Sequence, residues 1–315
     1  MFTQTIDILE VELANKCNAR CPQCPRYDDG RLRPGLNKDE ITLQTFTNID
    51  KDIIKNLKTI SFKGTTGDPI ISKDFFSIIE YIRSINQTLE IEVATNGGLH
   101  DVSYWQELAK LMSLGFVTFG IDGLAGIHEK YRIGTDFGIV IRNAQRFIQA
   151  GGRARWQFII FDHNEHQQEL CKQKSIELGF EKFEPIFSDR FTTVSETKVQ
   201  DKNETYSLKP SSQYTQNKKA TSVKCESFLY NYIFIYADGS VWPCCYLGGI
   251  TNWGKENPYM AVDMSMIKKH VMQEPGGLNI NEQRLSDILQ SENWNKWSWV
   301  FGGDLQRCRE YCGGR

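Results

Sequence analysis

The chain has 315 residues, 40% of them hydrophobic, and a formal net charge of −2. This length is enough for one large core, or for one large domain with a smaller one beside it. The small net charge and a pI of about 6.3 do not favour nucleic acid as a partner.

Strand-like and helix-like segments alternate through the first part of the chain. Apolar runs predict strands over residues 6–13, 59–63, 89–94, 116–121, 155–161 and 182–186. Helical spacing of apolar residues predicts helices over residues 38–56, 75–85, 103–113, 137–149 and 165–178. Six β–α alternations predict an α/β fold with a parallel sheet and helices packed on it. Right-handed crossovers would curl this sheet into a partial (β/α)6 barrel of the TIM type.

The composition changes twice along the chain, which predicts three parts. Residues 1–190 form the α/β core. Residues 191–224 are rich in Thr, Ser, Lys, Gln and Asn and are expected to be a solvated linker. Residues 225–315 are rich in aromatics, Gly and Cys, and are expected to form a small domain that contains a β-hairpin turning at Asp238-Gly239.

The location of the protein is inferred from two features. No stretch approaches 18 consecutive apolar residues, so no transmembrane helix is expected. Residues 1–7 lack the basic and apolar regions of a signal peptide. We therefore expect a cytoplasmic protein that does not bind membranes.

Nine cysteines in a reducing compartment favour metal binding or catalysis over disulfides. Cys17, Cys21 and Cys24 form one group, and five more cysteines lie between Cys225 and Cys312. Three closely spaced thiolates can hold three irons of a cubane cluster and leave the fourth iron open to a small molecule. A zinc site usually needs four protein ligands, and no fourth ligand is near in sequence.

The CxxxCxxC spacing directly after the first strand resembles that of the radical S-adenosylmethionine (radical SAM) superfamily. Motifs after the next three strands are also similar to those of that family: Gly64-Thr65-Thr66-Gly67-Asp68-Pro69, Ala94-Thr95-Asn96-Gly97 and Gly120-Ile121-Asp122-Gly123, the last followed by Arg132. Each motif lies at the carboxyl end of a predicted parallel strand, which is where α/β barrels carry their active sites. The resemblance covers roughly residues 6–190.

The resemblance implies that Cys17, Cys21 and Cys24 hold a 4Fe–4S cluster. It also implies that S-adenosylmethionine is bound by Thr66, Gly67, Asp68, Asn96, Asp122 and Arg132. The chain departs from the family pattern at three positions. Gln23 replaces an aromatic residue that packs near the adenine, Asp68 replaces a longer Glu, and Gly120 replaces a Ser. Without that hydroxyl, Arg132 would carry more of the binding of the methionyl carboxylate.

The C-terminal cysteines have a spacing of their own. Thirteen residues separate Cys225 from Gly239 and four separate Gly239 from Cys244, which resembles the start of SPASM and twitch auxiliary-cluster domains. With Cys308 and Cys312, four thiolates would fully ligate one further 4Fe–4S cluster, as in the twitch type. A zinc ribbon is the alternative. The spacing favours Cys244 over Cys245 as the ligand.

Cys245 would then be a spare thiol beside a cluster. It is either a structural thiol or a candidate hydrogen-atom donor, the catalytic role that a Cys has in some radical epimerases.

The resemblance implies an enzyme that reductively cleaves S-adenosylmethionine to a 5′-deoxyadenosyl radical, which abstracts hydrogen from a small-molecule or peptide substrate. Dehydrogenation, epimerisation and peptide modification all remain open as the net reaction. A flavodoxin- or ferredoxin-type protein would supply the electron. The alternative is a non-enzymatic iron–sulfur or zinc protein, such as an electron carrier or sensor, which would explain the cysteines but not the motifs at the strand ends.

Overall fold

The computed structural model describes residues 5–28, 30–33, 36, 38–191, 195–201, 204–214, 224–248, 263, 265–267, 278–297, 305, 308–309 and 312. Within these residues the main sheet has eight strands: β1 (Ile8–Val11), β4 (Thr59–Phe62), β5 (Glu90–Thr95), β6 (Gly115–Gly120), β7 (Ala154–Ile160), β8 (Lys182–Phe187), β11 (Tyr232–Ile235) and β12 (Val241–Trp242). None of the helices formed by these residues has the length and apolar character that spanning a bilayer requires.

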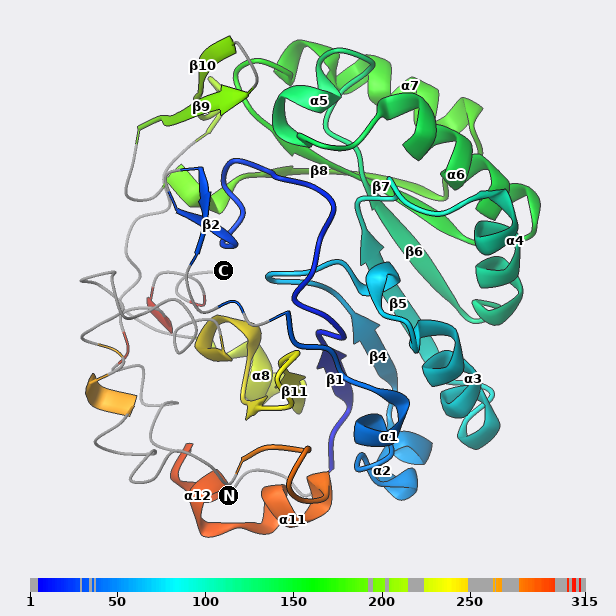
Figure 1. Ribbon diagram of the computed structural model, residues 1–315, viewed down its shortest axis with the longest axis vertical. Coiled ribbons are helices and arrows are strands. Elements are labelled where there is room, and N and C mark those ends of the chain that lie inside the picture. Colours follow the sequence, from blue (N-terminus) through cyan, green and yellow to red (C-terminus); the bar gives the residue numbers. More distant parts are fainter. Residues whose placement is uncertain are drawn as a thin grey trace.

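The strand order is β12-β11-β1-β4-β5-β6-β7-β8. All neighbouring strands from β11 to β8 are parallel, and β12 pairs antiparallel with β11. The six strands expected from the sequence are therefore adjacent and in chain order, which confirms the α/β fold with a partial barrel. The described strands form an open, curved sheet that ends at β12 and β8 (Figure 1).

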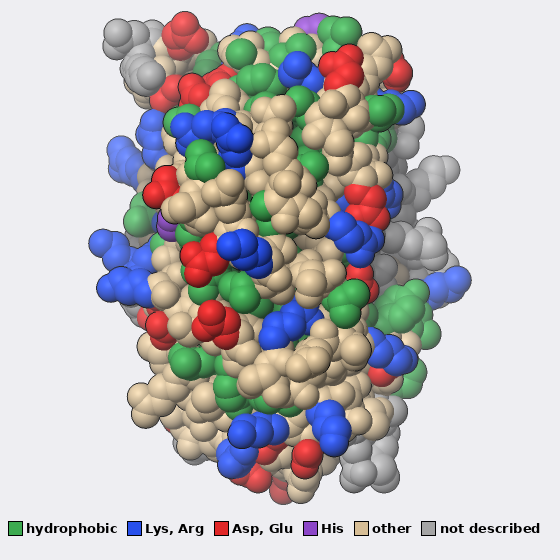
Figure 2. All heavy atoms as spheres, turned by 90° about the vertical axis from the view of Figure 1, so that its right-hand side faces the viewer, with side chains coloured by type: hydrophobic (Ala, Val, Ile, Leu, Met, Phe, Trp, Pro, Cys, Tyr) green, Lys and Arg blue, Asp and Glu red, His purple; other side chains and the backbone are tan. Residues whose placement is uncertain are grey.

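Helices cover the outer, convex face of the sheet (Figure 1). Those of the core are α1 (Leu43–Phe46), α2 (Lys51–Asn56), α3 (Phe75–Ile85), α4 (Val102–Leu111), α5 (His128–Tyr131), α6 (Phe137–Gln149) and α7 (Gln168–Glu177). Short 3-10 helices span Pro69–Ile71, Glu165–Gln167 and Asp189–Phe191. On the face in Figure 2, acidic and basic side chains are interspersed and hydrophobic ones appear singly or in small groups.

One helix expected from the sequence is instead two. The apolar spacing predicts a single helix over 38–56, but α1 ends at Phe46 and α2 begins at Lys51. Thr42 caps α1 through its hydroxyl, which accepts a hydrogen bond from the backbone of Thr45. Asp50, just before α2, instead accepts hydrogen bonds from Arg284 and from the backbone of Ser286. A contact with the distant C-terminal part therefore accompanies the break, and no local pattern could reveal it.

The two faces of the sheet differ in polarity. On β7, Ala154, Trp156, Phe158 and Ile160 are buried against the helices, whereas Arg155 and Gln157 face the concave side. The same alternation places Glu10 of β1, Ser61 of β4 and Glu92 of β5 at one level of the concave face, since these residues are register partners. Parallel sheets that are buried on both faces are apolar throughout. The polar concave face therefore lines a hollow.

Residues 191–224, expected as a linker, contain regular structure where they are described. β9 (Thr197–Asp201) and β10 (Glu204–Leu208) form an antiparallel hairpin. Asp201 pairs with Arg20, and Thr197 accepts a hydrogen bond from Gln23. A second short hairpin, β2 (Tyr27–Asp28) with β3 (Arg31–Leu32), follows the first cysteine group directly. The expected linker thus contacts the cysteine loop.

The C-terminal part joins the same sheet and core. β11 pairs with β1 along four residues, and the expected hairpin is present as β11 and β12. Its helices are α8 (Glu226–Leu229), α11 (Leu285–Gln290) and α12 (Glu292–Asn295). Phe234, Trp294 and Trp297 belong to the same hydrophobic cluster as the core strands. The described C-terminal elements therefore extend the α/β unit.

Candidate active site

The first cysteine group lies in the loop that follows β1. Cys17, Cys21 and Cys24 line one cavity of about 190 Å³ at the carboxyl end of the parallel strands. The backbone N–H of Cys24 donates to the carbonyl of Cys21 (2.9 Å), which forms the tight turn that brings the last two thiols together. The loop is anchored to the barrel by Ala14, which bridges to Glu40.

These thiols suit a cluster better than a free-thiol role. Burial raises the pKa of Cys17 and Cys21 to about 12 and that of Cys24 to about 11. Buried thiols of this kind become thiolates when a metal supplies positive charge. Among the described residues, no three Cys, His, Asp or Glu side chains lie close enough together to hold a single metal ion. Three thiols on the wall of one cavity instead fit a larger group such as a cubane cluster, in which each thiol would bind a different iron.

The glycine-rich loop after β4 forms a second wall of this cavity, through Gly64, Thr65, Gly67 and Asp68. A Cβ atom on Gly67 would lie 1.6 Å from the carbonyl oxygen of Ala14, so only glycine allows this approach to the cysteine loop. The backbone N–H of Asp68 donates to the carbonyl of Lys16 (2.8 Å). The two motifs therefore form one rigid unit.

Thr66 lies behind this wall. Its backbone N–H and its hydroxyl both donate to Glu12 Oε1 (2.7 and 2.8 Å), and the hydroxyl also lies 2.6 Å from that of Tyr236. Arg26 donates to the backbone carbonyls of Thr66 and Asn15. Sequence reasoning missed Glu12, Arg26 and Tyr236, although a carboxylate inside an apolar strand was a signal for the first.

Asp68 joins the glycine loop to the end of β5. Its carboxylate accepts hydrogen bonds from the hydroxyl of Thr95 (3.0 Å) and the backbone N–H of Asn96 (2.8 Å). It also caps the following 3-10 helix through the N–H of Ile70. Asn96 in turn directs its amide to Cys17 Sγ (3.5 Å) and to Asn18 Oδ1 (2.8 Å). Asp68 and Asn96 thus both line the cavity and fix its shape.

Arg132 and Gly120 form the third wall. A Cβ atom on Gly120 would lie 2.6 Å from Arg132 Nη2. The absence of a side chain at Gly120 is therefore what lets the guanidinium cross the strand end. Burial alone would lower the pKa of Arg132, but the Asp122 carboxylate raises it, so the guanidinium is charged.

Asp122 is fully buried and is not one of the residues that line the cavity. Its carboxylate accepts hydrogen bonds from Arg132 Nε (2.5 Å) and the backbone N–H of Ile159 (2.6 Å). His128 Nδ1 accepts a bond from the Asp122 backbone, while Nε2 bonds Thr135. Burial lowers the pKa of His128 to about 4, so this ring is neutral and supports the Asp122–Arg132 pair.

Gln23 does not take the place of an aromatic residue at the cavity. Its amide donates to Thr197 Oγ1 (3.2 Å) and accepts from Ser188 Oγ (2.7 Å). The side chain therefore connects the cysteine loop to β9 and to Ser188, which follows β8.

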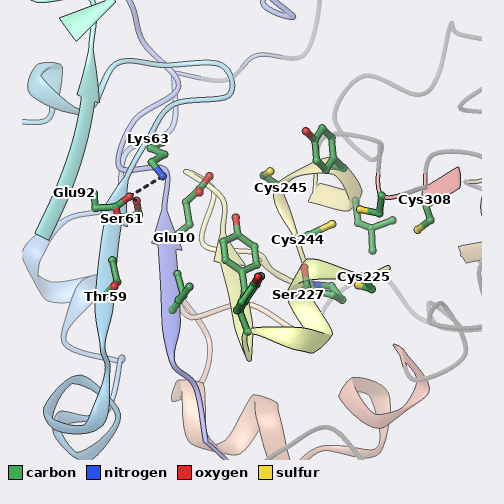
Figure 3. A pocket seen from close by; sticks show the side chains of 17 residues that line it. Glu10, Thr59, Ser61, Lys63, Glu92, Cys225, Ser227, Cys244, Cys245 and Cys308 are labelled. Atoms are coloured by element: carbon green, nitrogen blue, oxygen red, sulfur yellow. Dashed lines mark hydrogen bonds and ion pairs between the residues drawn. The ribbon is translucent and has the colours of Figure 1, made fainter. Parts of the chain in front are cut away.

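The second cysteine group lines another cavity, of about 330 Å³, on the concave side of β1 and β4 (Figure 3). Cys225, Cys244, Cys308 and Cys312 all contribute to it. Burial is the largest cause that raises the pKa of the Cys244 thiol. The other causes that raise it are electrostatic interactions with Cys308, Cys225 and Cys312. This arrangement groups Cys244 with Cys225, Cys308 and Cys312.

Cys245 points elsewhere. Burial is the main cause that raises its pKa, and the nearby charged or polar groups are Glu10 and Tyr232 as well as Cys244. Figure 3 shows Cys245 apart from Cys308 and Cys225, above the inner face of β1. The geometry thus places Cys244, rather than Cys245, with the other three cysteines.

Lys63 connects the two cavities, because it lines both of them. It follows β4 directly and forms an ion pair with Glu92 (2.9 Å), which also accepts a hydrogen bond from Ser61 (3.0 Å). The two cysteine groups therefore face a continuous concave region, with the strand-end motifs on one side and β11 on the other.

Two family models match this chain. The model of the radical SAM superfamily matches residues 11–172, which is half of the chain, and a model of an iron–sulfur cluster-binding domain, SPASM, matches residues 225–313. The first contains Cys17, Cys21 and Cys24, and the second contains all five cysteines that line the other cavity. These matches confirm the family resemblance, and they confirm iron–sulfur clusters and S-adenosylmethionine as the cofactors.

Curated relatives match over part of the chain. A GTP 3′,8-cyclase from Haemophilus influenzae is 30% identical over 155 residues, 48% of this chain and 43% of the relative. One from Microcystis aeruginosa is 29% identical over 96 residues, 30% of this chain and 29% of the relative. The chain thus matches less than half the length of these relatives.

Solved structures match over nearly the whole chain. Streptococcus suis SuiB bound to S-adenosylmethionine has a TM-score of 0.61 at 13% identity, covering 99% of this chain and 73% of that one. The enzyme anSMEcpe with AdoMet and a Cp18Cys peptide has a TM-score of 0.57 at 15% identity, covering 96% and 90%. BtrN with AdoMet and 2-DOIA has a TM-score of 0.52 at 13% identity, covering 100% and 95%. At such identities the likeness concerns the fold.

Proposed function

Because the chain belongs to the radical SAM superfamily, we propose that it is an enzyme that reductively cleaves S-adenosylmethionine in the cavity of Cys17, Cys21 and Cys24. One observation carries the proposal. Three thiols, a glycine loop and a buried, charged Arg132 line the same small cavity. When bound, the cluster and S-adenosylmethionine together supply an electron and a 5′-deoxyadenosyl radical that can take hydrogen from an unactivated carbon.

The residues around the thiols would bind and orient the methionyl group. Arg132, held by Asp122, would bind the carboxylate. The glycine loop with Asp68 would accept hydrogen bonds from the N–H groups of the methionyl amine, since it presents a carboxylate and backbone carbonyls. Asn96 would orient Cys17, and Thr66 would hold the loop through Glu12. Asp122 and Thr66 would therefore act as positioning residues.

The second cysteine group would hold an auxiliary 4Fe–4S cluster through Cys225, Cys244, Cys308 and Cys312. Four thiolates satisfy one cubane completely. Cys245, which faces Glu10 and Tyr232 instead, would be free to donate a hydrogen atom to a substrate radical in the same cavity. Substitution of Cys245 by Ala would then abolish an epimerisation but leave the first hydrogen abstraction intact.

The substrate would occupy the concave region between the two groups. Small molecules and peptides both remain candidates, since SuiB has been solved with a precursor peptide bound and BtrN with 2-DOIA. The net reaction would be a dehydrogenation, an epimerisation or a peptide modification. A flavodoxin- or ferredoxin-type protein would donate the electron.

The test is product formation by anaerobically reconstituted protein with dithionite and S-adenosylmethionine. Wild type should form 5′-deoxyadenosine and methionine and should contain about eight irons per chain. Each of Cys17→Ala, Cys21→Ala and Cys24→Ala should abolish the product and remove about four irons, whereas Cys171→Ala, in helix α7, should change neither. A loaded protein that forms no 5′-deoxyadenosine would instead be an electron carrier or sensor. Zinc in place of iron would exclude the radical enzyme and the iron–sulfur electron carrier.

A further inference from the structure

The cavity beside the second cysteine group carries an unbalanced charge. Among the described residues that line it, the acidic side chains are Glu10 and Glu92 and the basic one is Lys63. Lys63 is paired with Glu92 at 2.9 Å. Glu10 forms no ion pair with a described residue, and Lys63 acts electrostatically on both glutamates. Among the described lining residues, one cation therefore serves two carboxylates.

Glu10 lies where a ligand could reach it. It projects from β1 into the cavity, at the level of Ser61 and Glu92, and its carboxylate points toward the side where Cys245 lies (Figure 3). Burial raises its pKa, which Lys63 opposes. A further positive charge would therefore stabilise the ionised form.

A second polar group, the hydroxyl of Tyr232, lies beside Glu10 and Cys245. This hydroxyl is buried and makes no well-formed hydrogen bond with the described residues, although it lies close enough to the Glu10 carboxylate to lower the pKa of that group. Tyr232 lines the same cavity, and Glu10 and Cys245 are among the groups that raise its pKa. Leaving a buried hydroxyl without a partner costs about 1–3 kcal/mol, so this atom is suited to a ligand that donates or accepts a hydrogen bond there.

We infer that this cavity binds the substrate through a protonated amine, whose N–H groups donate to the Glu10 carboxylate and to the Tyr232 oxygen. The inference rests on the proposed function, because the Cys17 cavity must supply the chemistry. The volume of about 330 Å³ includes the space that a cluster on Cys225, Cys244, Cys308 and Cys312 would take, so the part beside β1 suits a small amine or the end of a side chain. Since Lys63 lines both cavities, an amine held at Glu10 places the rest of the molecule between the two cysteine groups.

The amine could belong to a free small molecule or to a lysine side chain of a peptide. Two probes distinguish these sources: putrescine, and Nα-acetyl-lysine amide. Butanediol, which has the length of putrescine but no charge, is the neutral control. Binding is measured by calorimetry on the anaerobically reconstituted enzyme with S-adenosylmethionine present and no reductant.

At least one amine probe should bind to wild type and butanediol should not. Glu10→Gln should weaken that binding by about tenfold or more, since a charged hydrogen bond is lost, while Glu10→Asp should retain part of it. Glu80→Gln, an exposed glutamate on α3, is the control and should match wild type. Both Glu10 variants are compared only as preparations with the iron content and unfolding midpoint of wild type.

The inference is overturned if neither amine binds, if butanediol binds as well as putrescine, or if Glu10→Gln binds as tightly as wild type. Preferential binding of the lysine amide would indicate a peptide, and preferential binding of putrescine a free amine. Formation of 5′-deoxyadenosine by wild type is measured separately. Its failure would refute the proposed function, whereas loss of amine binding alone would refute only this inference.

Discussion

At the scale of single residues, the site is held by groups that local patterns could only partly reveal. The cysteine spacing and the strand-end motifs pointed to most of the residues that line the cavity, whereas the predicted Thr66 and Asp122 lie behind its walls. The sequence could not show that Asp122 lies behind Arg132. An Asp that follows a strand can either stabilise a turn or contact a cofactor, and both roles require the same residue type. Glu12 was missed because its partner Thr66 is 54 positions away, and Tyr236, which contacts the Thr66 hydroxyl, is a further 170 positions along the chain.

Gly120→Ser should weaken S-adenosylmethionine binding without unfolding the chain. The new Cβ atom would lie 2.6 Å from the Arg132 guanidinium, which is the end of a flexible side chain and would move away. We expect KM for S-adenosylmethionine to rise about tenfold, a loss of ~1.4 kcal/mol. The measurement is the rate of 5′-deoxyadenosine formation against cofactor concentration. Gly138→Ser, at an exposed helical glycine of α6, is the control; equal KM values in both variants would contradict the role of Gly120.

Glu12 should make stability depend on pH. Burial raises its pKa from about 4.5 to about 7, so its neutral form is favoured in the folded state. The contribution of Glu12 to the free energy of unfolding is complete below pH ~4.5 and is lost as the pH rises to ~7. The free energy of unfolding changes by roughly 3 kcal/mol over this range. Glu12→Gln keeps the acceptor for Thr66 but cannot ionise. Its unfolding midpoint should fall less than that of wild type between pH 5 and pH 8, and parallel curves would count against this assignment.

At the scale of elements, apolar runs and helical spacing located the six core strands to within about two residues at each end. α3 and α6 have the predicted bounds, because their apolar faces are long and regular. The hairpin β9–β10 was not predicted. Its residues are polar, and it is held by contacts with Arg20 and Gln23 that lie far away in the sequence.

The pairing of β11 with β1 predicts that the core depends on the C-terminal part. A chain that ends at residue 224 would expose the edge of β1 and remove the aromatic side chains that complete its core. Exposed parallel edges promote aggregation. We therefore expect this shortened chain to be largely insoluble or aggregated in size-exclusion chromatography. Full-length Cys244→Ala, which lacks one proposed cluster ligand but keeps β11, is the control and should elute as wild type. A soluble, monodisperse shortened chain would show that the core folds independently.

At the scale of the whole molecule, the two cysteine groups lie on neighbouring elements of one curved sheet. Cys17, Cys21 and Cys24 follow β1, and Cys244 follows β12, the partner of β11. Metal bound at both groups would therefore link the same part of the sheet to loops from both ends of the chain.

Removing the iron should lower the stability of the whole chain. Metal that binds only the folded state adds its binding free energy to folding. We expect the thermal unfolding midpoint of reconstituted protein to fall by roughly 5 °C or more on anaerobic chelation, and to recover on reconstitution. Cys171→Ala should behave as wild type. An unchanged midpoint after confirmed loss of iron would show that neither group stabilises the fold.

Because side chains alternate along the parallel strands, the residues that form the hydrophobic core are different from those that line the cavity. On β1, Leu9 and Val11 are fully buried against the helices, whereas Ile8 and Glu10 face the cavity. Successive residues of one strand can therefore be selected independently, one set for folding and the other for the choice of substrate. Libraries that vary only the cavity-facing positions should keep the scaffold while new specificities are screened.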